Sequence, residues 1–127
     1  MQTLGPPLTT AGRLVEAVAA QDFPAVHDCF TDAVRFRALL PRGPVETTGP
    51  EAATDRFRGW FGEPDELEVV DAAISTIAGK ACLRWRLRLT TPTGASRLVE
   101  QHLFVSGDGR LDAVDLLCSG WMHGGAR

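Results

Sequence analysis

Residues 14–36 read LVEAVAAQDFPAVHDCFTDAVRF, an order that predicts two short helices followed directly by a strand. Apolar residues recur at spacings of three and four up to Ala19, which is typical of one face of a helix. Asp22 can cap the next helix, and Pro24 stands in its first turn, where a missing N–H costs nothing. The alternation from Val34 to Arg37 predicts a strand immediately afterwards.

Outward from this stretch, the pattern predicts a third helix and then a run of strands. Helix one is expected to have Thr9 or Thr10 as its cap and to end near Gln21, helix two to cover about residues 23–29, and residues 41–44 to form a loop. Helix three should run from about Pro50 to Gly62 on an apolar stripe of Ala53, Phe57, Trp60 and Phe61. Turns at 78–80, 92–94 and 107–109 then separate four strands, at about 67–77, 80–90, 96–106 and 110–119. This order predicts an α+β fold, with the helices on one face of a curved, mainly antiparallel sheet.

The length and composition fit one domain over residues 1–127, with a loose arm at 1–7 and a loose tail at 122–127. The formal charge of -3 and the lack of a basic run argue against a nucleic-acid partner. Cys29, Cys82 and Cys118 are odd in number and show no paired spacing, which indicates reduced thiols in the cytoplasm. The sequence has no secretion signal pattern and no apolar run of about 20 residues, so we expect no membrane partner. The three histidines are scattered, and we expect no metal and no cofactor.

Turn chemistry assigns the two faces of the sheet. A type I turn with a left-handed glycine pairs Thr91 with Ala95, and this register places Gln101 on an apolar face. The other face then carries Arg86 opposite Glu100, a favourable cross-strand charge pair. The apolar face shares Leu83, Trp85, Leu87, Val99 and Leu103.

The next turn decides where Asp115 points. A type I turn with a bulge at Gly109 pairs Ser106 with Arg110 and puts Asp115 on the face of Gln101. A carboxylate in so apolar a strand would be paired or would have a raised pKa, as a general base requires. The alternative is a further bulge, which would turn Asp115 to the outer face and into an ion pair with an arginine of the middle strands.

The chain resembles the nuclear-transport-factor-2-like superfamily, especially its bacterial SnoaL-like branch. The resemblance is carried by AAQDF at 19–23, TDAV at 31–34, GPEAA at 49–53 with Phe57 and Phe61, and the hairpin from EQHLF at 100–104 to GRL at 109–111. It implies a cone of three helices against a bent sheet, an apolar pocket between them, and frequent homodimers formed through the outer sheet face. The same scaffold hosts isomerases, cyclases, epoxide hydrolases, dehydratases and non-catalytic binding modules, so the fold alone does not give the function.

The residues expected in the isomerase and epoxide-hydrolase types are replaced here. By resemblance to ketosteroid isomerases, the base falls on Arg37, the oxyanion acid on Gln101 and the tyrosine near Leu14, and the chain contains no tyrosine. The limonene-epoxide-hydrolase type needs an arginine and an aspartate where this chain has two arginines, Arg84 and Arg86. Its second acid falls on Leu116. The polyketide-cyclase type uses an acid on the last strand, close to Asp115.

Three functional hypotheses follow. In the first, a hydrophobic small molecule with one polar group binds in the pocket, where Gln101 and Arg37 contact the polar group. In the second, a cyclase, isomerase or hydratase without cofactor uses Asp115 as base and Arg37 or Gln101 to stabilise an oxyanion. In the third, the outer face with Leu98, Phe104 and Arg84 forms a homodimer, and the pocket is filled by its own side chains. The expected pocket lining is Leu14, Trp60, Trp85, Leu87, Gln101, Leu103, Leu116 and Cys118. Simpler alternatives are a rim Arg37 paired with Glu46 or Glu51, and tryptophans that only pack the core.

Overall fold

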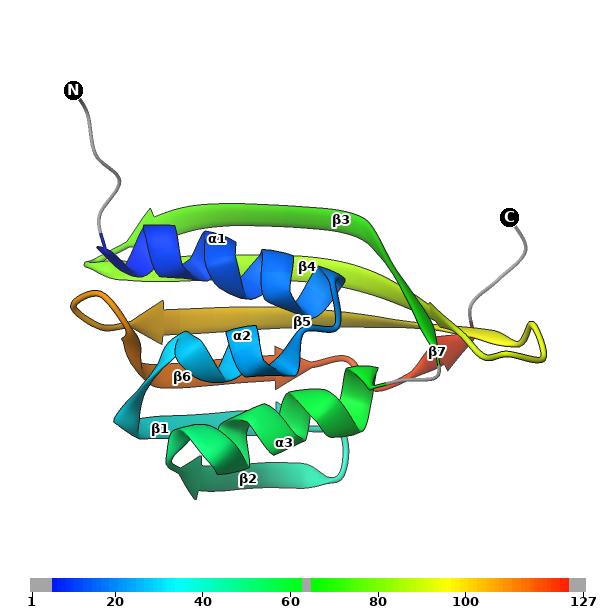
Figure 1. Cartoon of the computed structure of the whole chain (residues 1–127), viewed down its shortest axis with the longest axis horizontal. Helices are drawn as coiled ribbons and strands as arrows, with labels where there is room; N and C mark the ends of the chain where they lie inside the picture. Colours follow the sequence, from blue (N-terminus) through cyan, green and yellow to red (C-terminus); the bar gives the residue numbers. More distant parts are fainter. Residues whose placement is uncertain (1–5, 63–64, 124–127) are drawn as a thin grey trace.

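Three helices lie across one face of a long, bent sheet in the computed structural model, which describes residues 6–62 and 65–123 (Figure 1). The helices are α1 (Pro6–Ala19), α2 (Phe23–Asp28) and α3 (Pro50–Phe61). The strands are β1 (Phe30–Leu40), β2 (Gly43–Thr48), β3 (Glu66–Ile77), β4 (Lys80–Thr90), β5 (Ser96–Ser106), β6 (Leu111–Cys118) and β7 (Met122–His123). The sheet order is β2-β1-β6-β5-β4-β3, with β7 paired to β5, and among the described residues only the β1–β6 pair is parallel. The predicted α+β architecture is confirmed.

The break between α1 and α2 is a tight corner of residues 20–22, so helix one ends at Ala19, before the expected Gln21. Gln21 adopts a left-handed φ of 54°, and the Asp22 side chain accepts a hydrogen bond from the backbone N–H of Ala25 at 3.2 Å. The Gln21 side chain also donates to the carbonyl oxygens of Phe61 and Asp65, each at 2.8 Å. The corner therefore fixes the end of α1 against the segment that follows α3.

Four further boundaries differ from the prediction. Helix α1 begins at Pro6, because prolines are compatible with a first helical turn, so the expected arm is shorter; residues 1–5 lie outside the described part. Strand β1 begins at Phe30, earlier than expected, and residues 43–48 form β2. Gly43, at a φ of 129°, makes the turn that returns β2 along β1. In the expected tail, Met122 and His123 pair with β5, and residues 124–127 lie outside the described part.

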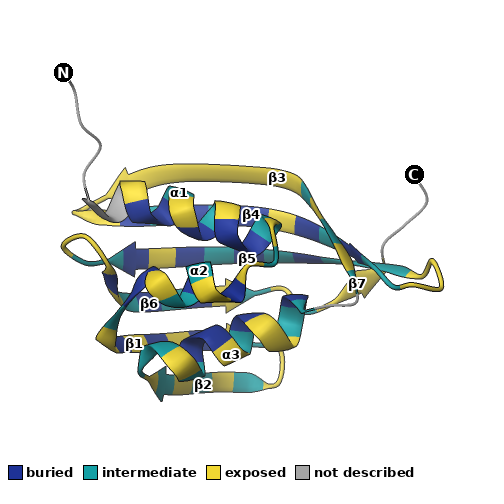
Figure 2. Ribbon diagram, in the orientation of Figure 1, coloured by how far each residue is buried: buried dark blue, intermediate teal, exposed yellow. Residues whose placement is uncertain are grey.

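The register of the β4–β5 hairpin is confirmed. Arg86 lies opposite Glu100 and Trp85 opposite Gln101, and the Thr91 N–H donates to the Ala95 carbonyl at 2.8 Å. Burial alternates along both strands accordingly (Figure 2).

The register of the β5–β6 hairpin is not the predicted one. Ser106 pairs with Ala113 instead of Arg110, which shifts every residue of β6 by three positions. Gly107 and Gly109 both have positive φ, 155° and 98°, so the connection is a longer loop than a type I turn with a bulge. An odd shift exchanges the two faces of a strand, and Asp115 consequently faces the same side as Phe104.

Candidate functional site

The predicted pocket residues come together on the inner face of the sheet, under the helices. Six of them are at most 2% exposed, and Trp60 and Cys118 are half-buried. The six are Leu14, Trp85, Leu87, Gln101, Leu103 and Leu116.

Gln101 is the polar centre of this inner face. Its Oε1 accepts a hydrogen bond from Nε1–H of Trp85 at 2.9 Å. Its Nε2 donates to Sγ of Cys118 at 3.5 Å, and within the described ranges that sulfur is the acceptor for the amide. A thiol sulfur is a weak acceptor, whereas the amide nitrogen carries two donors. The amide could therefore form a stronger hydrogen bond with an oxygen atom.

Aromatic rings fill the space between the helices and this face. Phe57 of α3 lies at centroid distances of 5.7 to 6.3 Å from four other rings and 6.4 Å from a fifth. The five are Phe30, Phe36, Trp60, Phe61 and Trp85. Trp121 continues the chain of contacts outward, 6.4 Å from Phe61 and with the Arg97 guanidinium 4.0 Å from its ring centre. The interior is thus packed, with its less buried rings at the end of α3 and after β6.

Arg37 and Asp115 lie on the outer face, away from Gln101. They are register partners on the parallel strands β1 and β6, and Nε of Arg37 donates to Oδ1 of Asp115 at 2.6 Å. Of the two positions expected for Asp115, the structure has the one on the outer face, with Arg37 of β1 as its partner instead of an arginine of the middle strands. An inward Arg37 is wrong, because Phe36 and Ala38 on either side of it point inward. The hydrogen bond from Arg37 lowers the pKa of the Asp115 carboxyl, the opposite of what a general base at neutral pH needs.

Ionisable carboxylates and histidines are missing from the buried polar groups of the described residues, which are Thr10, Thr54 and Gln101. The thiol of Cys29 is also buried, and desolvation raises its pKa to about 11. A proton acceptor that works at neutral pH would have to come from the surface. No group of three or more metal-ligating side chains occurs in the part of the chain that the structure describes.

The outer face carries a hollow of about 590 Å³ that the sequence reasoning missed. Leu39 and Leu117, 52% and 47% exposed, flank the ion pair of Arg37 and Asp115, with Phe104 beside them. Alternation along β1 could have revealed Leu39, since it shares a face with Arg37. The outward position of Leu117 could be predicted only from the shifted register of β6.

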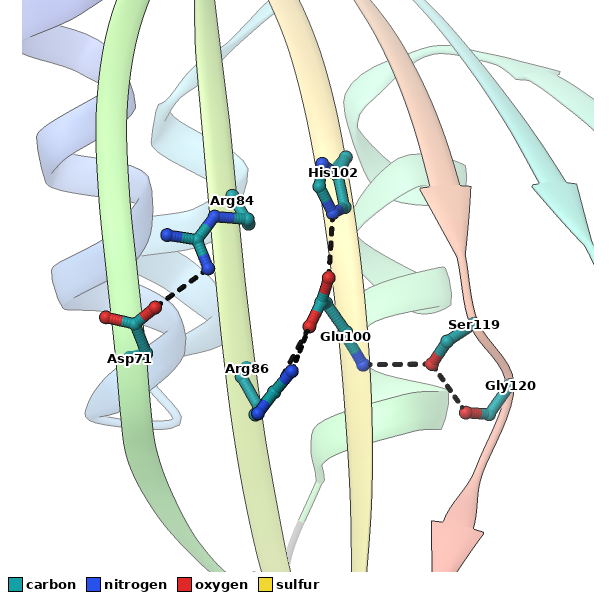
Figure 3. Close-up of polar contacts among 7 residues, drawn as sticks. All are labelled: Asp71, Arg84, Arg86, Glu100, His102, Ser119 and Gly120. Atoms are coloured by element: carbon teal, nitrogen blue, oxygen red, sulfur yellow. Dashed lines mark hydrogen bonds and ion pairs between the residues drawn. The ribbon is translucent and has the colours of Figure 1, made fainter.

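Next to the hollow, polar side chains form a ladder across β3, β4 and β5 (Figure 3). Arg84 bonds Asp71 at 2.8 Å, and Glu100 bonds both Arg86 at 2.8 Å and His102 at 2.9 Å. The hydrogen bonds from His102 and Arg86 lower the pKa of Glu100. Both arginines of this ladder are paired with an acid, so this part of the outer face is close to neutral.

None of the described helices is both long and apolar enough to serve as a membrane-spanning segment.

Solved structures share the fold at low sequence identity. An LEH-like epoxide hydrolase from M. tuberculosis matches with a TM-score of 0.69 and 14% identity, over 90% of this chain and 83% of the other. A protein assigned as a polyketide cyclase from Pseudomonas putida matches with a TM-score of 0.69 and 13% identity, over 90% and 91% of the two chains. An NTF2-like protein of unknown function from Cytophaga hutchinsonii matches with a TM-score of 0.62 and 15% identity, over 88% of this chain and 98% of the other. At such identities the likeness shows the NTF2-like fold and no particular reaction.

No curated protein matches the chain. The family model for the SnoaL-like domain matches residues 11–114, most of the chain. The chain therefore belongs to the SnoaL-like family, which has an NTF2-like fold.

Proposed function

We propose that this protein binds a small hydrophobic molecule inside the cone and that Gln101 bonds the single polar group of that molecule. The observation that carries the proposal is the amide of Gln101, which is fully buried and whose Nε2 faces only a thiol sulfur at 3.5 Å among the described residues. A carbonyl or hydroxyl oxygen is a better acceptor for that donor. The family hosts proteins related to cyclases, isomerases and epoxide hydrolases, which is consistent with a small organic ligand.

The ligand enters beside the end of α3. Trp60 is half-buried there, whereas its ring neighbours Phe36, Phe57 and Phe61 are fully buried. Because these rings fill the interior, a ligand gains room only if a ring turns outward, and Trp60 is the least buried of these four rings. The free thiols of Cys29, Cys82 and Cys118 agree with a cytoplasmic protein.

The contacts of Asp115 do not support the alternative in which it is the general base of an enzyme. Its carboxylate is on the outer face, is bonded to Arg37, and has a lowered pKa. Arg37 is held in the same pair and does not reach the inner face. We therefore propose binding without proton transfer by these two residues.

Replacing Gln101 with leucine tests the proposal with two probes that differ by one hydroxyl group, 2-naphthol and naphthalene. We expect 2-naphthol to raise the melting temperature of the wild type. Gln101→Leu should bind 2-naphthol roughly five- to tenfold more weakly, the value of about one hydrogen bond, and naphthalene about equally well. Calorimetric titration measures both affinities.

Arg37→Ala is the matched control, since Arg37 lies outside the cone, and it should bind both probes as the wild type does. Unchanged melting temperature and tryptophan fluorescence with a series of flat phenols and ketones would refute interior binding. A loss of 2-naphthol binding in Arg37→Ala alone would move the site to the outer hollow.

A second candidate function is self-association through the outer face. It is favoured by the exposed apolar side chains of Leu39, Phe104 and Leu117, which surround the neutralised pair of Arg37 and Asp115. The core of a protein interface is apolar and poor in free charge, and the two charges within this patch neutralise each other. We propose that two copies bury this patch against each other.

Leu117→Glu should halve the mass of the assembly in solution, because it puts an unpaired carboxylate at the centre of the patch. Light scattering after size-exclusion chromatography measures the mass. Asp112→Asn, an exposed change on the same strand but outside the hollow, is the control and should leave the mass unchanged. Equal masses for the wild type and Leu117→Glu would contradict the outer-face contact.

A further inference from the structure

Residues 119–123, which follow β6, form a short strap at one end of the cone. The strap turns at Gly120, which has a φ of 80°, and then runs as β7 beside the start of β5, where residues 122–123 pair with residues 97–98. Figure 1 shows β7 at the end of the sheet, close to the end of α3. The strap therefore lies where the helix layer and the sheet meet.

The strap contacts three elements at this end of the cone. A Cβ at Gly120 would lie 2.6 Å from Cγ of Pro41, so the strap packs closely against the turn between β1 and β2. The Trp121 ring lies 6.4 Å from the ring of Phe61, the last residue of α3. The guanidinium of Arg97, on β5, lies 4.0 Å from the centre of the Trp121 ring. The strap thus reaches from the β1–β2 turn to α3 and β5.

Arg97 holds the strap to the rest of the fold. It is on the same face of β5 as Gln101, four residues away. Its Nη2 donates to Oδ2 of Asp65 at 3.1 Å, and the Asp65 carbonyl in turn accepts the hydrogen bond from Gln21. A guanidinium over an indole ring is attractive. One arginine therefore connects Trp121 to the segment after α3 and to the corner between α1 and α2.

Little buried surface holds the strap in place. Four of its five residues are exposed and Gly120 is half-buried, whereas Phe61, against which Trp121 packs, is 0% exposed. Segments with few buried apolar contacts open locally at a small fraction of the cost of global unfolding. The strap is therefore a cover that can open while the core behind it stays folded.

The strap is also bonded to the polar centre of the inner face. Sγ of Cys118, the acceptor for the Gln101 amide, accepts a second hydrogen bond from the backbone N–H of Gly120 at 3.4 Å. Just before that, Ser119 is fixed to β5, because its Oγ accepts from the Glu100 N–H at 3.0 Å and its own N–H donates to the Glu100 carbonyl at 2.9 Å (Figure 3). Opening therefore starts after Ser119 and breaks the bond to the thiol.

We propose that the strap is a gate at this end of the cone. The contacts of Trp121 with Phe61 and Arg97 hold it closed, and it opens after Ser119 to uncover the thiol of Cys118 beside Gln101. Opening costs two strand pairs and these Trp121 contacts among the described residues. That a ligand enters through this gate rests on the proposed interior binding, whereas the opening itself does not.

The three cysteines measure strap opening without any ligand. Cys118 contacts the strap, Cys82 faces outward on β4, and Cys29 is buried in the core at 4% exposure. Labelling with iodoacetamide, followed by mass spectrometry, gives a rate for each thiol. In Trp121→Ala we expect Cys118 to react about five- to tenfold faster, because the ring contact and the cation–π contact are lost. Cys82 and Cys29 should react at their wild-type rates.

Met122→Ala is the matched control. Met122 is 41% exposed and Trp121 40%, and the change keeps the backbone pairs of β7. This variant should leave the labelling of Cys118 unchanged. Equal Cys118 rates in the wild type and Trp121→Ala would overturn the proposal. An equal acceleration of Cys29 would also overturn it, because that thiol reacts only when the core opens.

Stopped-flow fluorescence with 2-naphthol tests the gate as the entrance. Trp121→Ala should raise the association and dissociation rate constants together, each about five- to tenfold, and leave Kd nearly unchanged, because the strap opens before either step. Binding with unchanged rate constants would overturn the entrance. Absence of 2-naphthol binding to the wild type would refute interior binding, and the labelling of Cys118 would still decide whether the strap opens.

Discussion

Phe57→Ala is expected to lower the free energy of unfolding by about 3–5 kcal/mol, the range for deletion of a buried phenylalanine. Phe57 is 0% exposed, and its ring contacts five other rings around it. Removing it from this centre leaves a cavity that rings held by α3 and the sheet cannot collapse to fill. Urea denaturation of dilute protein measures the change.

Phe104→Ala is the matched control for this deletion. It removes the same ring from the outer face, where Phe104 is 37% exposed, and should cost less than about 1 kcal/mol in dilute protein. If the two variants lost equal stability, the interior would not be packed as described. Naphthalene should stabilise Phe57→Ala more than it stabilises the wild type, because it can occupy the new cavity.

Gly107→Ala is expected to cost about 3 kcal/mol or more, from left-handed backbone strain together with a steric clash. Gly107 has a φ of 155°, and a Cβ placed there would lie 2.1 Å from the carbonyl oxygen of Arg110 and 2.8 Å from Cα of Leu111. Both contacts are with backbone atoms, so no side-chain rotation relieves them. The β5–β6 loop would have to open.

Gly109→Ala measures the cost of backbone strain without a steric clash, in the same loop. Gly109 also has a positive φ, 98°, but a Cβ there meets nothing within 4 Å. It should cost about 1–2 kcal/mol, the value of a left-handed residue alone. Urea denaturation of both variants gives the comparison, and a cost for Gly107→Ala no larger than that for Gly109→Ala would show that the loop is not held at this close approach.

The sequence predicted the register of the β4–β5 hairpin correctly because that register depends on the residues of its own turn. Gly94 with its neighbours requires one turn type, and that turn alone brings Trp85 opposite Gln101. The register of the β5–β6 hairpin also depends on β1, which lies far away in the sequence. The Leu111 N–H donates to the carbonyl of Cys29 at 2.8 Å, so β6 is aligned by β1 as well as by its own turn. A reading of the turn alone could not include that contact.

The long-range alignment of β6 by β1 also limited the prediction of the candidate functional site. The inner-face residues around Gln101 follow from alternation along β4 and β5, and they were found. The inward position of Phe36 was equally readable, and it implied that Arg37 points outward. The side on which Asp115 lies depends on β6 and was not readable. Strand β2 was missed because its sequence, GPVETT, has weak strand signals, and pairing with β1 holds it in place.

The parallel ladder between β1 and β6 also constrains how the chain reaches its folded state. Arg37 and Asp115, partners in that ladder, are 78 residues apart in the sequence. Within the described residues the β1–β2 hairpin joins the rest of the sheet only through β6, so a long loop must close before the two parts meet. Contacts of such long range slow folding. During synthesis the backbone edge of β1 that faces away from β2 therefore stays unpaired until residues 111–118 have left the ribosome.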